Sequence, residues 1–223
     1  MKADLLDFER FRGARGEEWL MRIGRASAPA ILIVPPLFEE MNRTRALIAA
    51  MMRWLAKRGH GCWLIDLAGT GESGRDLEGI NWDDWRHDVT LAAAYVAEKA
   101  RRPLVASLRG GALVDHGAAA RGWWRFAPAE GAALARDLVR SGLAGGVEWA
   151  GYGPADALKA SLEAAAPAPV LPLRTVRLAT DRGTADAKVE GPALWRRSEP
   201  GNSATLAEAL AADLHRWSRD CVG

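Results

Sequence analysis

Length, composition and charge place this chain among ordinary globular proteins. It has 223 residues, of which 49% are hydrophobic and 26% are charged, and its formal net charge is +2. A chain of this length can bury a full hydrophobic core without metal or disulfide cross-links, and it suits one α/β domain over residues 1–223. The small net charge excludes a global attraction to nucleic acid or to a membrane.

Cysteine usage and hydropathy narrow the class further. The two cysteines, Cys62 and Cys221, cannot form a disulfide framework, and the sequence has no metal-binding spacing such as C-x-x-C or H-E-x-x-H. Acids stand among residues 1–7, where a signal peptide would need an apolar run, and no apolar stretch reaches the length of a membrane span. We therefore expect a cytoplasmic protein with no metal, no cofactor, no membrane span and no nucleic-acid partner.

Strands and helices alternate along the chain. A hairpin over residues 7–12 and 18–23 comes first, with its turn at residues 13–16. Continuous apolar runs then predict buried strands, and apolar residues at helical spacing predict amphipathic helices. The later strands are expected at residues 30–34, 62–66, 103–107, 123–126, 173–179 and 193–196. The helices are expected at residues 42–58, 82–100, about 110–120, 130–141, 154–165 and 204–218.

This order predicts an α/β fold with a mostly parallel sheet of about eight strands, an antiparallel N-terminal edge and helices on both faces. Residues 127–165 leave room for little or no cap domain. Ligands of such sheets bind in a crevice at the carboxyl ends of the strands. Four segments should therefore border the crevice, at residues 35–40, 66–73, 107–111 and 127–130.

Residues 103–113 have the layout of a nucleophile elbow, with a short apolar strand, a turn of small residues and a helix start. The elbow motif is G-x-S-x-G, in which a sharp turn exposes the serine above the sheet. Here the five positions read Ser107-Leu108-Arg109-Gly110-Gly111, so Arg109 stands in the place of the nucleophile. A guanidinium stays protonated and has no lone pair with which to attack a substrate.

Two motifs resemble those of the α/β-hydrolase superfamily. Residues 66–73 are similar to its D-x-x-G-x-G-x-S loop, and Trp82, Trp85 and Asp88 resemble the W-x-x-W-x-x-D helix start that often follows that loop. The resemblance implies an α/β-hydrolase fold. An active member needs a nucleophile at the elbow, a histidine base and an acid that orients the base.

A narrower resemblance is carried by residues 35–45, which are similar to the P-P-F-x-E-E-M-N-K-x-R signature of the exosortase A system-associated hydrolases, type 2. Residues 147–152 are similar to the V-E-V-A-G-Y segment of the same group, which also has an L-R-x-G sequence at the elbow. The group accompanies bacterial exopolysaccharide and protein-sorting gene clusters. The resemblance therefore implies a protein partner from such a system, although a fold does not establish a function.

The triad histidine is missing from its expected place. It should follow the last strand, but residues 197–202 contain no histidine. Structural or surface roles explain the four histidines better; they are His60, His87, His116 and His215.

The catalytic residues are therefore unknown, and four candidates remain. Asp181 stands where the orienting acid belongs, but without a histidine it is better explained as a turn residue. Ser107 ends its strand, and its side chain should point into packing rather than into the crevice. Glu39 and Glu40 follow a strand and could act as acid or base, or stabilise the start of the next helix.

The same end of the sheet is the expected ligand site. Arg109 at a helix N-terminus could hold a carboxylate, a phosphate or an acidic sugar, with Gly110, Phe38, Glu39 and Glu40 around it. The alternative is an internal ion pair with Glu39 or Glu40, because an unpaired buried arginine costs several kcal/mol. We favour the internal pair, which is compatible with ligand binding if the pair opens.

Three functions remain open. The favoured one is a degenerate hydrolase that binds an anionic or carbohydrate-like small molecule, or a protein partner. The second is an active ester or acyl hydrolase that uses Ser107 or a water activated by a carboxylate. The third is a non-catalytic assembly component of an exopolysaccharide or sorting system.

Overall fold

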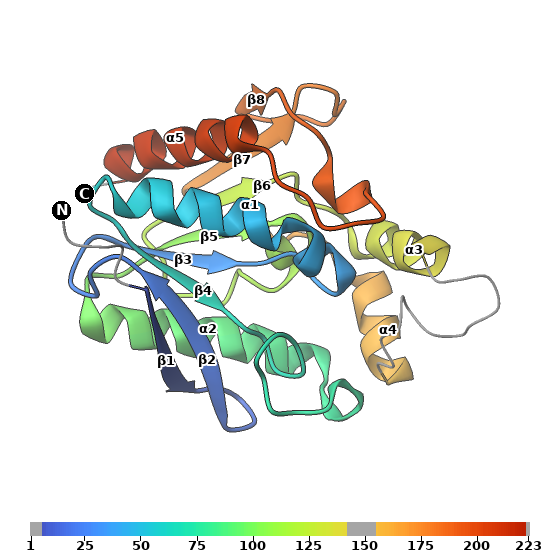
Figure 1. The fold of residues 1–223 in the computed structure, drawn as a ribbon. Helices are drawn as coiled ribbons and strands as arrows, with labels where there is room; N and C mark the ends of the chain where they lie inside the picture. The colour runs from blue at the N-terminus through green and yellow to red at the C-terminus, as the bar shows by residue number, and fades with distance from the viewer. Residues whose placement is uncertain (1–5, 142–154, 222–223) are drawn as a thin grey trace.

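One mixed sheet forms the centre of the molecule (Figure 1), as the computed structural model of residues 6–141 and 155–221 shows. Its eight strands have the order β1-β2-β4-β3-β5-β6-β7-β8. The pairs β1–β2 and β2–β4 are antiparallel, and the other five pairs are parallel. The strands are β1 (Leu6–Arg12), β2 (Glu17–Ile23), β3 (Ala30–Val34), β4 (Gly61–Ile65), β5 (Leu104–Leu108), β6 (Trp123–Phe126), β7 (Leu173–Leu178) and β8 (Ala187–Val189).

Helices cover both faces of the sheet, and the expected fold class is confirmed. Helices α1 and α5 pack against each other on one face, and α2 lies on the other (Figure 1). No large cap domain is present in the described residues. The helices are α1 (Glu39–Ala56), α2 (Trp82–Lys99), α3 (Gly131–Ser141), α4 (Asp156–Ala164) and α5 (Ala204–Asp220), with short 3₁₀ helices η1 (Leu77–Gly79), η2 (Arg109–Leu113) and η3 (Leu194–Arg196).

The central strands are buried on both faces because their side chains alternate between two cores. In β3, Leu32 and Val34 join the core under α2, whereas Ile31 and Ile33 join the core under α1 and α5. All five residues of β3 are buried. This alternation explains the continuous apolar run in the sequence.

The start of α2 ties three parts of the fold together. Asn81 and Asp84 form a reciprocal capping box at its N-terminus. The buried Asp88 carboxylate accepts from the backbone N–H of Ala14 in the β1–β2 turn (2.8 Å) and of Ala68 after β4 (3.1 Å). The Trp85 indole donates to the Ala68 carbonyl (2.8 Å). Two residues of the W-x-x-W-x-x-D pattern, Trp85 and Asp88, thus hold α2, the hairpin and the loop after β4 together.

The helix expected at residues 110–120 is wrong. Only the 3₁₀ helix η2 forms there, and the chain then turns. Gly110 and Gly111 have low helix propensity. In addition, Asp115 just after η2 is buried and accepts from Arg125 on β6. Arg109 consequently does not stand at the N-terminus of a regular helix.

The strand expected at residues 193–196 is also wrong. These residues form η3, and the last strand is the short β8, which was not predicted. Leu194 and Trp195 are consecutive and both buried, which a strand with alternating faces would not allow at the edge of a sheet. Trp195 packs edge-on against Phe126, with 5.7 Å between ring centroids.

Two histidines meet at the amino-terminal end of the parallel strands. His60 Nε2 and His215 Nδ1 are 2.9 Å apart, a contact that needs one proton between the two nitrogens. Burial lowers the pKa of both imidazoles, and nearby positive charges lower each pKa further. The folded protein therefore favours neutral imidazoles at this position.

We expect this pair to make stability depend on pH. As the pH falls through the ordinary histidine pKa of 6.5, the unfolded chain binds protons that the folded chain does not bind. The free energy of unfolding of the wild type, relative to that of a His60→Gln/His215→Gln variant, should therefore fall between about pH 7 and about pH 5. Urea unfolding of both proteins measures this difference, and a difference that is constant across the range would contradict it.

Candidate functional site

A cleft of about 660 Å³ opens at the carboxyl ends of the parallel strands, where the ligand crevice is expected. Its wall combines the loop after β3 and the start of α1 with α3 and η3. Its lining residues are Leu37, Phe38, Glu39, Glu40, Arg43, Leu134, Asp137, Leu138, Arg140, Trp195, Arg196, Arg197 and Ser198.

The backbone beside the cleft is strained at three strand ends. Phe38, Arg109 and Ala127 are the non-glycine residues with positive φ in the described chain, at 55°, 52° and 45°. They follow the neighbouring strands β3, β5 and β6. Left-handed backbone in such residues costs on the order of 1–3 kcal/mol and is typical of functional sites. At Arg109 it is the conformation of a nucleophile elbow, so the turn itself is present.

The two glycines of the elbow are required by close packing. A Cβ on Gly111 would lie 2.6 Å from the carbonyl oxygens of Val34 and Pro35 at the end of β3. A Cβ on Gly110 would lie 2.6 Å from Leu134 Cδ1 on α3. The turn is therefore seated against the neighbouring strand and helix, as the motif requires.

Arg109 is held by an internal ion pair with Glu40, as the sequence analysis favoured. Its Nε and Nη2 donate to the Glu40 carboxylate (3.1 and 3.0 Å), and its Nη1 donates to the Ala127 carbonyl (3.2 Å). The Trp195 ring lies over the guanidinium, with Cζ 4.7 Å from the ring centroid. Only 11% of the Arg109 side chain is exposed. The guanidinium thus lies behind Glu40 and Trp195, which form the cleft wall.

Glu40 is a buried ionisable group in the lining of the cleft. Its side chain is 8% exposed, and burial raises its pKa, whereas the Arg109 guanidinium opposes this rise. Its charged form therefore depends on Arg109. Glu39, in contrast, is held at the rim, where it accepts from Asn42 (3.2 Å) and lies 3.7 Å from Arg43.

Ser107 belongs to a buried network away from the cleft. Its hydroxyl donates to Asp115 (2.7 Å), and Asp115 forms a close ion pair with Arg125 on β6 (2.6 Å). Both charged side chains are nearly inaccessible, at 0% and 3% exposure. Burial raises the pKa of Asp115, and the hydrogen bonds and charge of Arg125 oppose the rise. Ser107 is therefore a donor inside the sheet, as its position at the strand end predicted.

Other candidates lie elsewhere. Asp181 accepts from the Gly183 N–H (2.8 Å) and from Arg177 (2.9 Å) in the turn after β7, which confirms its expected turn role. None of the four histidines, all of which lie in the described residues, lines the cleft. Within the described residues, no group of three or more potential ligands could hold a metal ion.

The structure thus separates the expected ligand residues. Phe38, Glu39 and Glu40 line the cleft, whereas Arg109 and Gly110 lie behind its wall. Ligand contact with any of them stays a prediction.

Sequence reasoning missed the opposite wall of the cleft. It comes from η3 and contains Trp195, Arg196 and Arg197. The sequence predicted a strand for residues 193–196, and that prediction gave no reason to place two adjacent arginines at the crevice.

Breaking the Arg109–Glu40 pair should destabilise the fold. We expect Arg109→Met to lower the free energy of unfolding by about 3–5 kcal/mol near neutral pH, because Glu40 is then a buried, unpaired carboxylate. Losing Arg109 raises the Glu40 pKa further, so the deficit should shrink as the pH falls toward about 5 and the carboxyl is protonated. Urea unfolding at two pH values measures both effects.

The double variant Glu40→Leu/Arg109→Met is the matched control. It removes both charges and should be more stable than Arg109→Met alone near neutral pH. Equal stability of the two variants at both pH values would show that the pair is not coupled.

No protein-family model and no curated protein matches this chain. Solved structures share its fold: a thermophilic esterase from Thermogutta terrifontis with malate bound has a TM-score of 0.61 at 12% identity, covering 97% of this chain and 100% of that one. The bottromycin epimerase BotH, in complex with bottromycin A2, has a TM-score of 0.58 at 14% identity with the same coverage.

A third structure is the lidless α/β serine hydrolase XC6422 of Xanthomonas campestris, with a TM-score of 0.53 at 15% identity over 97% of this chain and 96% of that one. Two longer hydrolases are spanned by this chain over only 46% and 40% of their lengths. The full-length likenesses and the sheet topology together show that the chain has the α/β-hydrolase fold.

Proposed function

We propose that this protein is a non-hydrolytic α/β-hydrolase-fold protein that binds a small anionic ligand in the cleft. The main support for the proposal is the Arg109–Glu40 pair, because Arg109 stands in the position of the nucleophile and its side chain is paired with Glu40. A cation that is permanently protonated cannot start acyl transfer. The epimerase among the similar structures supports a role of this fold outside hydrolysis.

The arginines of the cleft favour an anion as the ligand. Arg196 and Arg197 are exposed on its wall, and neither forms an ion pair within the described residues. Arg140 on α3 is 76% exposed, and its contact with Asp137 is 3.5 Å long. Free guanidinium groups bind carboxylates and phosphates through paired hydrogen bonds.

A carbohydrate that stacks on an aromatic ring fits the cleft less well. Trp195 is 6% exposed, Arg109 lies over its ring, and Phe126 packs against it at a steep angle. Phe38 is buried against Trp85, with 5.4 Å between ring centroids. An acidic sugar held through its charge stays compatible with the proposal.

Active ester hydrolysis is the alternative. Glu40 lies at the cleft and has a raised pKa, which suits an acid or base. However, both of its oxygens accept hydrogen bonds from Arg109, and the Ser107 hydroxyl donates to Asp115 rather than to a histidine. A role of Ser107, Glu39, Glu40 or Asp181 in catalysis is therefore less well supported.

An association with exopolysaccharide or protein-sorting machinery rests on residues 35–45. The structure gives these residues a physical function: they form the loop after β3 and the start of α1, and supply Glu39 and Glu40 to the cleft. The second similar segment, residues 147–152, lies outside the described residues. We retain this association as part of the proposal.

A fluorophosphonate probe tests the absence of an activated serine. We expect no stoichiometric labelling of the purified protein, because Ser107 is buried and paired with Asp115. An active serine esterase labelled in parallel and measured by intact mass is the control. Stoichiometric labelling that is lost in Ser107→Ala would overturn the proposal.

Ligand binding should depend on the arginines of η3. We expect the affinity for the tightest-binding member of a panel of carboxylates and phosphate monoesters to fall by about tenfold or more in Arg196→Gln/Arg197→Gln, because each lost bond is charge-assisted. Calorimetric titration measures the affinity. Arg182→Gln removes an exposed arginine outside the cleft and should bind as the wild type does. Equal binding by the double variant, or no binding by any panel member, would count against the anion site.

A further inference from the structure

The end of the molecule opposite to the cleft carries a concentration of positive charge. Loops between β2 and β3, after α1 and between α2 and β5, together with the last turn of α5, meet at the amino-terminal end of the parallel strands. We call this surface the basic end. Its exposed cations are Arg25, Lys57, Arg58, Arg101, Arg102 and Arg219.

Contacts between these segments show that they form one surface. The Gly61 N–H donates to Pro29 (3.1 Å), which joins the start of β4 to the loop before β3. Arg121 links the loop before β5 to the end of α5. Its backbone N–H donates to the Pro103 carbonyl (3.0 Å), and its Nη1 donates to the Ser218 carbonyl (3.2 Å). In Figure 1 the carboxyl ends of α1, α2 and α5 lie at the same end of the molecule.

The positive charge of the basic end is not neutralised internally. None of its six cations forms an ion pair within the described residues. Nearby acids are few: Glu98 and Asp220 are exposed there, whereas Asp7 and Glu9 pair with Arg22. Cations near the carboxyl ends of helices are stabilised by the helix dipole, whereas cations in the loops are not.

The two histidines beneath this surface respond to the same charge. Burial is the main cause of the lowered pKa of His215, and Arg219, Arg58 and Arg216 lower that pKa further. Burial, His215 and Arg121 lower the pKa of His60, although a hydrogen bond to the backbone carbonyl of Pro29 raises it. Both imidazoles thus lie close to positively charged side chains at this end of the molecule.

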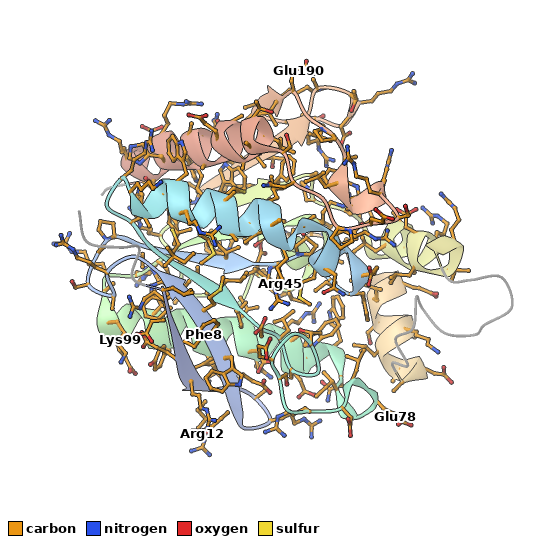
Figure 2. All side chains as sticks on the ribbon, viewed as in Figure 1. Phe8, Arg12, Arg45, Glu78, Lys99 and Glu190 are labelled. Atoms are coloured by element: carbon orange, nitrogen blue, oxygen red, sulfur yellow. The ribbon has the colours of Figure 1, made fainter. Side chains whose placement is uncertain are left out.

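Large apolar side chains are exposed beside these cations. Leu6 and Phe8 on β1 are 55% and 53% exposed, and they lie on the same face of the strand. Leu6 pairs with Ile23, two residues before Arg25. Figure 2 shows Phe8 and Lys99 toward the same end of the molecule, away from Glu78.

We propose that the basic end docks this protein onto the surface of an anionic lipid bilayer, with its cations on the headgroups and with Leu6 and Phe8 in the interfacial layer. Cations beside exposed apolar side chains fit a bilayer, which offers both anionic groups and an apolar boundary. A nucleic acid would contact the cations through its phosphates but would leave Leu6 and Phe8 in water. The docking is peripheral, since none of the described helices is long and apolar enough to cross a membrane. It is independent of the cleft, which then faces the solvent.

Flotation with vesicles tests this docking on the full chain. We expect binding to phosphatidylcholine vesicles that contain phosphatidylglycerol, none to pure phosphatidylcholine vesicles, and a loss of binding as salt rises well above about 0.1 M. Arg101→Glu/Arg102→Glu should lower the vesicle affinity by more than tenfold. Phe8→Ser should lower it several-fold and leave the salt dependence in place.

Arg12→Glu/Arg182→Glu is the matched control, because it makes the same change in charge at two exposed arginines outside the basic end. It should bind vesicles more tightly than the Arg101/Arg102 variant does, and circular dichroism should show that all variants unfold at similar temperatures. Equal loss in both double variants, binding to pure phosphatidylcholine, or an unchanged affinity of Phe8→Ser would overturn the proposal. Tighter binding to a duplex DNA oligonucleotide than to the anionic vesicles would overturn it too.

Discussion

The ion pair between Arg109 and Glu40 is the constraint on which the carboxyl end of the sheet depends. Arg109 stands on a strained turn after β5, and Glu40 comes from the first turn of α1. The same guanidinium also bonds the end of β6 through Ala127 and lies against Trp195 of η3. A buried pair of this kind gives little net stability, because desolvation of both charges offsets their attraction. Its effect is to fix geometry, since four segments must meet for either charge to be satisfied.

The turn of the elbow is present, and Arg109 stands where the motif has its nucleophile. Positive φ at Arg109 and the close approach of Gly111 to the end of β3 are features that expose a nucleophile in an active hydrolase. Here they place a cation where it can be covered by Glu40 and Trp195. The exposed guanidinium groups of the cleft, on Arg196 and Arg197, come instead from the segment after the last strand. The proposed ligand site therefore lies on the wall of the crevice opposite to the elbow.

Charge is distributed unevenly over the molecule in spite of a net charge of +2. Acids such as Glu40, Asp88 and Asp115 lie inside the fold, where they accept hydrogen bonds from arginines or from backbone N–H groups. Several cations of the loops have no such partners and collect at one end. Net charge alone describes solubility, whereas docking depends on where the unpaired charges lie.

The sequence by itself determined the layers of the fold. Patterns with a period of two or 3.6 residues located most strands and helices, since local hydrophobic spacing reflects the face that each element buries. It also located the elbow and the pairing of Arg109 with a glutamate after β3, because parallel strands end side by side. Only the tertiary structure decided which glutamate forms the pair, that η2 replaces a helix, that η3 replaces a strand and that Asp115 joins Arg125. These outcomes depend on contacts between distant segments, in which a buried charge must find a partner, and no local pattern records that requirement.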